Sequence, residues 1–298
     1  MTETVSTPTV LDDAFERMAA SSAFELANGF VNHGPMGVEA LAAMGLEEQI
    51  DEWARRFERV PGPAVGGVPT QDLDWKEALG DYRLLPEWIG HLELAIDEHG
   101  WQEVTEVWVP RLMPALSTKL FHGAIHVGHV VRSLTVADTP ARRTELARAL
   151  GYWAARYHPG QPLTAGSREF DGDLRTAAVA AAADAARYYL AEPSILNLHG
   201  VTGAMAIELL VDHLPPTAGQ AGLAQVRAEH AALYAGSEAV KDVRTAGVEA
   251  DAVACAAASS GDVHAVKLVE ACRRGLAVSG DPVFAAAAET VTGMAVIA

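Results

Sequence analysis

The chain has 298 residues, and its 39 acidic against 22 basic side chains give a formal net charge of −17 at pH 7. A charge of that sign argues against nucleic acid or an anionic membrane surface as the main partner, because both would repel the protein. Half of the residues are hydrophobic but only 6% are aromatic, so the length suffices for a sizeable core that is rich in alanine.

The cysteine count and the first residues of the sequence indicate the cellular compartment. Two cysteines, Cys255 and Cys272, are too few for a disulfide framework and fit a reducing environment. Both lie in apolar, alanine-rich sequence, where we expect buried thiols. The opening stretch MTETVSTPTVLDD lacks the basic and apolar regions of a signal peptide, and no apolar run approaches the roughly 20 residues that span a bilayer. We therefore expect a soluble, cytoplasmic protein.

Apolar residues recur at steps of three and four along most of the chain, and this spacing predicts helices. In chain order the predicted helical segments are 11–30, 45–60, 86–100, 101–119, a histidine-rich segment from 120, 139–157, 172–192, 192–214, 221–236, 262–275 and 281–298. One stretch, EVTEVWVP at 103–110, also alternates as a strand would. The pattern as a whole predicts an all-α protein.

The longest irregular stretch is HPGQPLTAGSREFDG, residues 158–172, where glycine and proline are spaced throughout. Histidines of interest occur on both sides of it, which favours one shared interior. We therefore predict a single multi-helical domain over residues 1–298, with a buried site lined by histidines.

The stretch LFHGAIHVGH places His122, His126 and His129 at i, i+4 and i+7 of a predicted helix. At about 100° per residue the three side chains fall within roughly 60° of one another. The flanking residues are apolar, so this helix is expected to be buried. A buried imidazole without a partner costs about 1–3 kcal/mol, so each histidine requires one.

Two further patterns bring histidine into apolar helices. The dipeptide His-Gly occurs at His33, His122 and His199, and its glycine leaves room for a bulky group or for a close helix contact. In GDVHAVKLVEAC, His264 and Lys267 share one helix face among apolar residues. Burial would lower the pKa of that lysine, and a neutral amine can react with CO2 to give a carbamate that binds metals as a carboxylate does.

Each of these residues also has a simpler interpretation. Histidines on apolar faces are more often hydrogen-bonded core residues than metal ligands, and Lys267 could extend its amine to the surface along its apolar stem. Short metal-binding signatures such as H-E-x-x-H, Glu-x-x-His and C-x-x-C do not occur. A metal site therefore has to be assembled from distant helices. His91, His99, His213 and His230 lie among charged residues, and we expect them at the surface or at helix ends.

Four segments in this order, NHGPMGVEALAAMG, HGAIHVGHVVRSL, LHGVTGAMAIELL and DVHAVKLVEAC, resemble the questin oxidase-like family over residues 28–275. The family includes enzymes that open anthraquinone-type rings oxidatively, and one branch consists of non-haem iron dioxygenases with histidine ligands and a carboxylated lysine. The resemblance implies Fe(II) as the cofactor, with a CO2-derived carbamate on the lysine. The metal ligands that it implies are His33, His122, His199, His264 and Lys267.

Two more histidines of the same segment receive a catalytic assignment. His129 also matches a histidine of the family, and it would orient a ligand or contact the substrate. His126 stands where many relatives have arginine, so the substrate contacts are expected to differ. The chain is also shorter than the fungal members, which indicates a reduced pocket wall.

The expected function is that of a non-haem Fe(II)-dependent oxygenase. It would use O2 to cleave or oxygenate a ring of an aromatic, anthraquinone-like polyketide. No G-x-G-x-x-G follows a strand pattern, so no bound nicotinamide or flavin is expected. Two alternatives stay open, a zinc-type hydrolase and a non-catalytic helical protein that binds a polycyclic ligand or haem.

Overall fold

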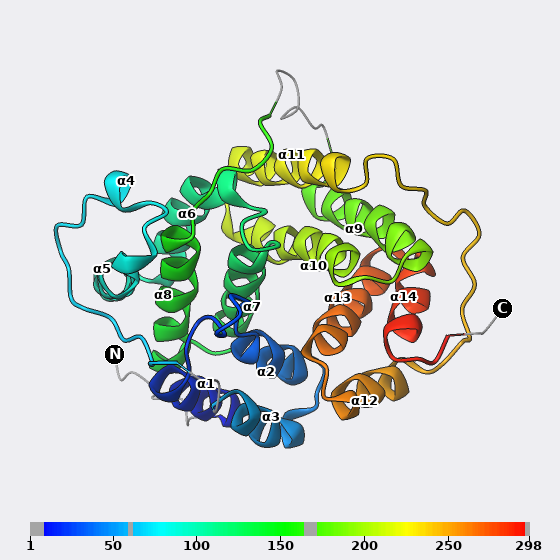
Figure 1. Ribbon diagram of the computed structural model, residues 1–298, viewed down its shortest axis with the longest axis horizontal. Helices are drawn as coiled ribbons and strands as arrows, with labels where there is room; N and C mark the ends of the chain where they lie inside the picture. The colour runs from blue at the N-terminus through cyan, green and yellow to red at the C-terminus, as the bar shows by residue number, and fades with distance from the viewer. Residues whose placement is uncertain (1–8, 59–61, 164–171, 296–298) are drawn as a thin grey trace. The chain divides into compact units, whose positions relative to one another are not determined.

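The computed structural model describes residues 9–58, 62–163 and 172–295, and Figure 1 shows that these residues form helices joined by loops. Within these ranges the only β-type pairing is an isolated bridge between Glu25 and Val31. The predicted all-α class is therefore confirmed. The stretch 103–110, which alternates as a strand would, belongs to helix α6 (Trp101–Leu112).

The irregular segment predicted at 158–172 is partly visible. Residues 158–163 form no helix, whereas residues 164–171 lie outside the described residues. The next helix, α9, begins at Leu174, where the Asp173 carboxylate accepts a hydrogen bond from the Thr176 backbone amide. An aspartate at this position is a typical helix N-cap.

The contacts of the chain separate it into two compact units, each built from two stretches. Unit 1 comprises Met1–Val107 and His126–Tyr157, and unit 2 comprises Trp108–Ile125 and His158–Ala298. One boundary coincides with the start of the irregular segment, but the others fall inside α6 and inside α7 (His122–Val136). A boundary within a helix leaves no composition signal, and the single domain over 1–298 stays a prediction.

Unit 1 is a set of helices in which α8 packs against both α1 and α5, while α1, α2 and α3 pack against one another. Its helices are α1 (Val10–Ser21), α2 (Gly34–Ala43), α3 (Ile50–Phe57), α4 (Trp75–Ala78), α5 (Leu85–His99), most of α6, α7 beyond Ile125, and α8 (Pro140–Ala155). Short 3-10 turns occur at Glu47–Gln49 and Tyr82–Leu84.

A buried carboxylate joins the first helix of unit 1 to its last. Asp12 is 2% exposed, and its Oδ1 accepts hydrogen bonds from the Arg142 Nε and the Thr139 Oγ1, both at 2.8 Å. Burial alone would raise the pKa of Asp12, but the hydrogen bonds from Thr9 and Thr139 and the charge of Arg142 outweigh it and lower the pKa.

Unit 2 is centred on α10, which packs against α9, α11 and α13 (Figure 1). Its helices are α9 (Leu174–Ala191), α10 (Ile195–Leu210), α11 (Pro216–Leu233), α12 (Ala250–Ser260), α13 (Val263–Ser279) and α14 (Val283–Val291), with 3-10 turns at Met113–Ala115 and Val211–His213. The buried side chains of α9 are mostly alanines. Because the side chain of alanine is a single methyl group, this composition lets α10 approach α9 closely.

Two expectations from the sequence are corrected in unit 2: that both cysteines are buried, and that no apolar run approaches the length that spans a bilayer. Cys272 is buried as predicted, but Cys255 is exposed. One described segment, Ile195–His213, is long and apolar enough to cross a membrane by length and composition, with a mean hydropathy of 1.3. It is 67% buried within the protein, and a buried core helix passes the same test.

Replacing Asp12 by alanine is expected to lower the free energy of unfolding by about 3 kcal/mol, because it leaves the Arg142 guanidinium buried without its carboxylate. Urea denaturation of the variant measures the change. Asp13→Ala is the matched control, since Asp13 lies in the same helical turn but is exposed. Equal stability of the two variants would contradict the assigned role of Asp12.

Candidate metal centre

The first histidine of the site stands directly after a left-handed turn. Lys119, Leu120 and Phe121 have φ angles of 51°, 56° and 66°, and left-handed backbone costs about 1–2 kcal/mol for each residue with a side chain. The turn directs the Lys119 carbonyl at the Nδ1 of His122, the first residue of α7. That carbonyl accepts the Nδ1 proton, so His122 presents its Nε2 lone pair elsewhere.

The second histidine, His199, lies one turn into α10 and is 1% exposed. Its Nδ1 donates a hydrogen bond to the Ile195 carbonyl at 2.7 Å. Ser194 caps the same helix through a 3.2 Å hydrogen bond from the Asn197 backbone amide. The helix start therefore fixes the ring, and His199 also keeps its lone pair on Nε2.

His122 and His199 face each other through these two nitrogens. The Nε2 atoms are 3.1 Å apart, and the ring centroids are 4.6 Å apart. Because both Nδ1 atoms donate to carbonyls, neither neutral ring has a proton to share at this contact. Two electron pairs that close repel each other, and a cation bound by both removes the repulsion.

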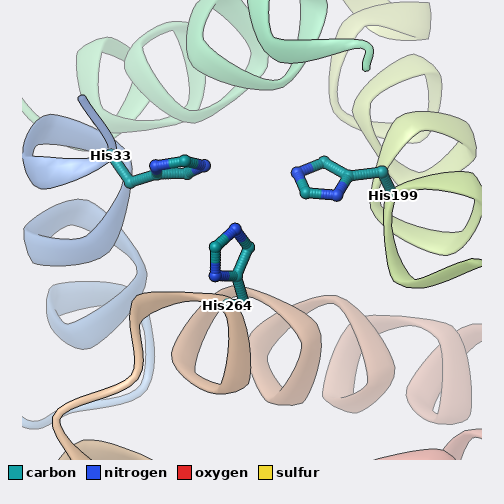
Figure 2. A group of neighbouring side chains, drawn as sticks. All are labelled: His33, His199 and His264. Atoms are coloured by element: carbon teal, nitrogen blue, oxygen red, sulfur yellow. The ribbon is translucent and has the colours of Figure 1, made fainter. Parts of the chain in front are cut away.

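The third histidine enters from α13. The ring of His264 lies 5.4 Å from that of His199, edge to face, and Figure 2 shows both rings converging from their separate helices. Asp262 caps α13 by accepting a 2.8 Å hydrogen bond from the His264 backbone amide, and the same oxygen lies 3.2 Å from the His264 Nδ1. Asp262 thus both begins the helix and orients the ring.

Lys267 completes the group one turn further along α13. It is 0% exposed, and its Nζ makes no hydrogen bond within the described part of the chain. The alternative prediction, that Lys267 extends its amine to the surface along its apolar stem, is therefore wrong. Burial lowers its pKa to about 7, although Asp262 acts in the opposite direction. Near neutral pH a large fraction of this amine therefore carries a lone pair instead of a charge.

The two buried imidazoles are held in the neutral form. Burial, together with the positive charge of Lys267, lowers the pKa of His122 well below its ordinary value and that of His199 to about 3. Neutral imidazole is the form that binds metals. The site therefore offers imidazole nitrogens and an amine in a buried setting, a donor set that suits iron, zinc, copper or nickel.

His33 belongs to unit 1, where it precedes the first residue of α2 and is 6% exposed. Asn32 shapes this helix start, because its Oδ1 accepts from the Gly34 backbone amide at 2.9 Å and its Nδ2 donates to the Ala23 carbonyl. Figure 2 draws His33 together with His199 and His264. Its role as a metal ligand stays a prediction, because the other proposed ligands belong to unit 2.

His126 and His129, the predicted catalytic residues, belong to unit 1 and have carboxylate partners. The His126 Nε2 lies 2.8 Å from the Glu145 Oε1, and the His129 Nδ1 lies 2.5 Å from the Glu39 Oε2. Glu39 also accepts two hydrogen bonds from Arg132. These contacts are buried hydrogen bonds between histidines of α7 and carboxylates, and the catalytic assignment of both histidines stays a prediction.

Sequence reasoning missed both carboxylates, although one of them left a signal. Glu39 is the only charged residue of α2, GPMGVEALAA, and an isolated acid in an apolar helix indicates a buried partner. Burial acts to raise the pKa of Glu39, but Arg132 and His129 outweigh it and hold the pKa below its usual value. Glu145 left no comparable signal, because it lies among arginines in the sequence.

A second layer of side chains supports His199 from α11. His230 was expected at the surface or at a helix end; it lies in the last turn of α11, where it is 9% exposed and its Nε2 donates to the Gly200 carbonyl at 3.0 Å. A methyl group built on Gly200 would lie 2.0 Å from the Tyr234 hydroxyl. The glycine after His199 therefore admits a bulky neighbour, as the His-Gly pattern predicted. Gly34 does the same after His33, where a methyl group would lie 2.8 Å from the Met18 sulfur.

These supporting residues also line a groove of about 420 Å³ in unit 2. Tyr188 and Tyr234 stack in parallel along it with ring centroids 4.1 Å apart, and Arg227 and His230 border the same space. Its volume lies within the range of small-molecule sites. His199 is not among the residues that line this groove.

Comparison with known proteins adds no relative. No family model matches the chain, and no curated protein matches it. The resemblance to the questin oxidase-like family therefore rests on the four sequence segments alone and stays a prediction.

Acidification is expected to destabilise the protein partly through His230, whose pKa burial lowers to about 4. Between about pH 4 and pH 6.5 the unfolded chain binds more protons at this group than the folded one, so the free energy of unfolding rises with pH across that window. Across that window, the titration of His230 changes the free energy of unfolding by about 3 kcal/mol, at 1.36 kcal/mol per pKa unit. Below about pH 4 this part of the stability is lost.

The variant His230→Gln keeps a donor for the Gly200 carbonyl and cannot be protonated, so its stability should depend less steeply on pH. Chemical denaturation at several pH values compares it with the unaltered protein. His99→Gln is the control, because that side chain is 48% exposed. Parallel curves for His230→Gln and the unaltered protein would contradict the assignment.

Proposed function

We propose that this protein is a metal-dependent oxygenase whose ion is bound in unit 2 by His122, His199, His264 and Lys267. One observation carries the proposal: the His122 and His199 Nε2 atoms lie 3.1 Å apart while both Nδ1 atoms donate to carbonyls. A hydrogen bond between the two neutral rings would need a proton that neither has at that position. Both atoms can lie about 2.1 Å from one ion, the usual metal–nitrogen distance.

The neighbouring amine supports a metal over a purely structural cluster. Lys267 is fully buried, and its Nζ lacks a hydrogen bond within the described residues, an arrangement that is costly unless the amine binds something. As an amine it is a fourth nitrogen donor. As a CO2-derived carbamate it would add a negative charge that three neutral imidazoles cannot supply.

Fe(II) is the proposed ion, and this identity comes from the sequence resemblance. When bound, it supplies the electron that lets triplet O2 react with a closed-shell aromatic ring. The protein residues hold the ion and exclude water, since His122 is 5% and His199 is 1% exposed. The side chain of His264 is 20% exposed, so access to the ion is expected from its side.

The proposed substrate is an electron-rich ring of an anthraquinone-like polyketide, cleaved or oxygenated with O2. This substrate class also rests on the resemblance. The sequence around His264 and Lys267 is apolar, and α13 buries Val263, Val266 and Leu268. A cytoplasmic location stays part of the proposal, as do catalytic roles for His126 and His129.

Metal analysis of untagged protein is the direct test. We expect near-stoichiometric iron in the unaltered protein and its loss in His199→Ala, because that variant removes one of the two facing nitrogens. His213→Gln is the control, since His213 lies in unit 2 at the 3-10 turn after α10, outside the site. Oxygen consumption with anthraquinones then tests the reaction. Zinc in place of iron would favour a hydrolase.

His33→Ala extends the same measurement to the ligand predicted in unit 1. Loss of iron comparable to that of His199→Ala would assign His33 to the ion. Retention of iron would restrict the ligand set to unit 2 and remove His33 from it.

A second candidate function is the binding of a polycyclic ligand without turnover, and the groove beside α11 favours it. The stacked Tyr188 and Tyr234 offer an aromatic surface to a planar molecule. Several folded preparations without metal, which also take up no Fe(II) anaerobically, would eliminate the oxygenase. Anthraquinone binding that survives Lys267→Met but not Tyr188→Ala would then establish the second candidate.

A further inference from the structure

We propose that Gly203 is a positioning residue of the metal centre, which holds the His122 imidazole in place through the ring of Phe121. This inference rests on the proposed function, since it assigns a role toward the same ion. Gly203 lies on α10 one turn beyond His199, and neither it nor Phe121 offers a donor atom to a metal. The role is therefore one of placement.

The turn before His122 needs an anchor. Lys119, Leu120 and Phe121 all adopt left-handed backbone, which side chains disfavour. The hydrogen bonds that close the turn are long, with 3.3 Å from the Phe121 amide to the Ser117 carbonyl and 3.3 Å from the His122 amide to the Lys119 carbonyl. Backbone hydrogen bonds alone do not account for this conformation.

The Phe121 side chain supplies that anchor. It is 4% exposed and contacts the His230 ring edge to face, with centroids 6.5 Å apart. Its ring fills the space that a side chain at 203 would occupy, since a methyl group on Gly203 would lie 2.5 Å from the Phe121 Cγ. Carbon atoms that are not bonded to each other do not approach this closely, so any residue but glycine at position 203 displaces the Phe121 ring.

Displacement of the ring moves the carbonyl that controls His122. The α10 backbone is a regular helix held by its own hydrogen bonds, whereas the left-handed turn is strained, so the turn yields first. The Lys119 carbonyl would then leave the His122 Nδ1. Without that acceptor, the imidazole loses both its tautomer preference and its direction toward His199.

A double-mutant cycle isolates this effect from a general loss of stability. Alanine is a better helix former than glycine, so Gly203→Ala does not weaken α10 through helix propensity. We expect Gly203→Ala to weaken Co(II) binding, followed by absorption spectroscopy, at least tenfold. In the Phe121→Leu background the same change should cost less than twofold, because the ring that it displaces is gone.

The matched control is Gly222→Ala in α11. There the added methyl group would meet the flexible end of Met113 at 3.1 Å, and no change in Co(II) binding is expected. A buried helical glycine is replaced in both variants, so a difference between them reflects the contact with Phe121.

A second readout needs no metal. In protein labelled with nitrogen-15 histidine, the His122 signals, assigned with His122→Gln, should report a protonated Nδ1 and a bare Nε2. Gly203→Ala should convert them to a mixture of tautomers. If the unaltered protein binds no metal while this change still occurs, the proposed function fails and the positioning role stands.

Folded Gly203→Ala with unchanged tautomer and unchanged Co(II) affinity would overturn the proposal. Should that variant not fold, Phe121→Leu alone decides, because leucine keeps the interior apolar but does not fill the space above Gly203. Weaker Co(II) binding and mixed tautomers in Phe121→Leu would support the proposal. Values equal to those of the unaltered protein would overturn it.

Discussion

The contact between two imidazole nitrogens 3.1 Å apart is the constraint around which unit 2 is built. Both rings are buried and neutral, and both direct an electron pair at the same point. Such an arrangement is unfavourable by itself, and the surrounding protein maintains it. The Lys119 and Ile195 carbonyls hold the outer nitrogens, and the glycines of α10 admit the aromatic side chains that pack behind them.

Helix α7 shows that identical side chains one or two turns apart can have different chemistry. One nitrogen of His126 lies against the carboxylate of Glu145, and one nitrogen of His129 lies against that of Glu39. His122 lies against a carbonyl on one side and another imidazole on the other. His122 therefore differs from the other two in that its second nitrogen faces another imidazole nitrogen.

Close helix packing fixes the geometry of the candidate metal centre. Alanine on α9 and glycine on α10 let backbones and rings approach to contact distance, and rigid helices hold ligands more accurately than loops. The exception is the left-handed turn before His122, where the imidazole lies next to strained backbone. Strain of this kind persists only where packing over-determines it, and it concentrates at functional sites.

The amino-acid sequence by itself determined the helical class, the helix that carries His122, and the pairing of His264 with Lys267, because these depend on local spacing along the chain. It also indicated why glycine follows His199. Only the tertiary structure decided that His122 faces His199, that Lys267 is fully buried, and that His126 and His129 belong with carboxylates. These pairings join residues up to 90 positions apart, and helical periodicity reports which face is apolar but not which helix will cover it.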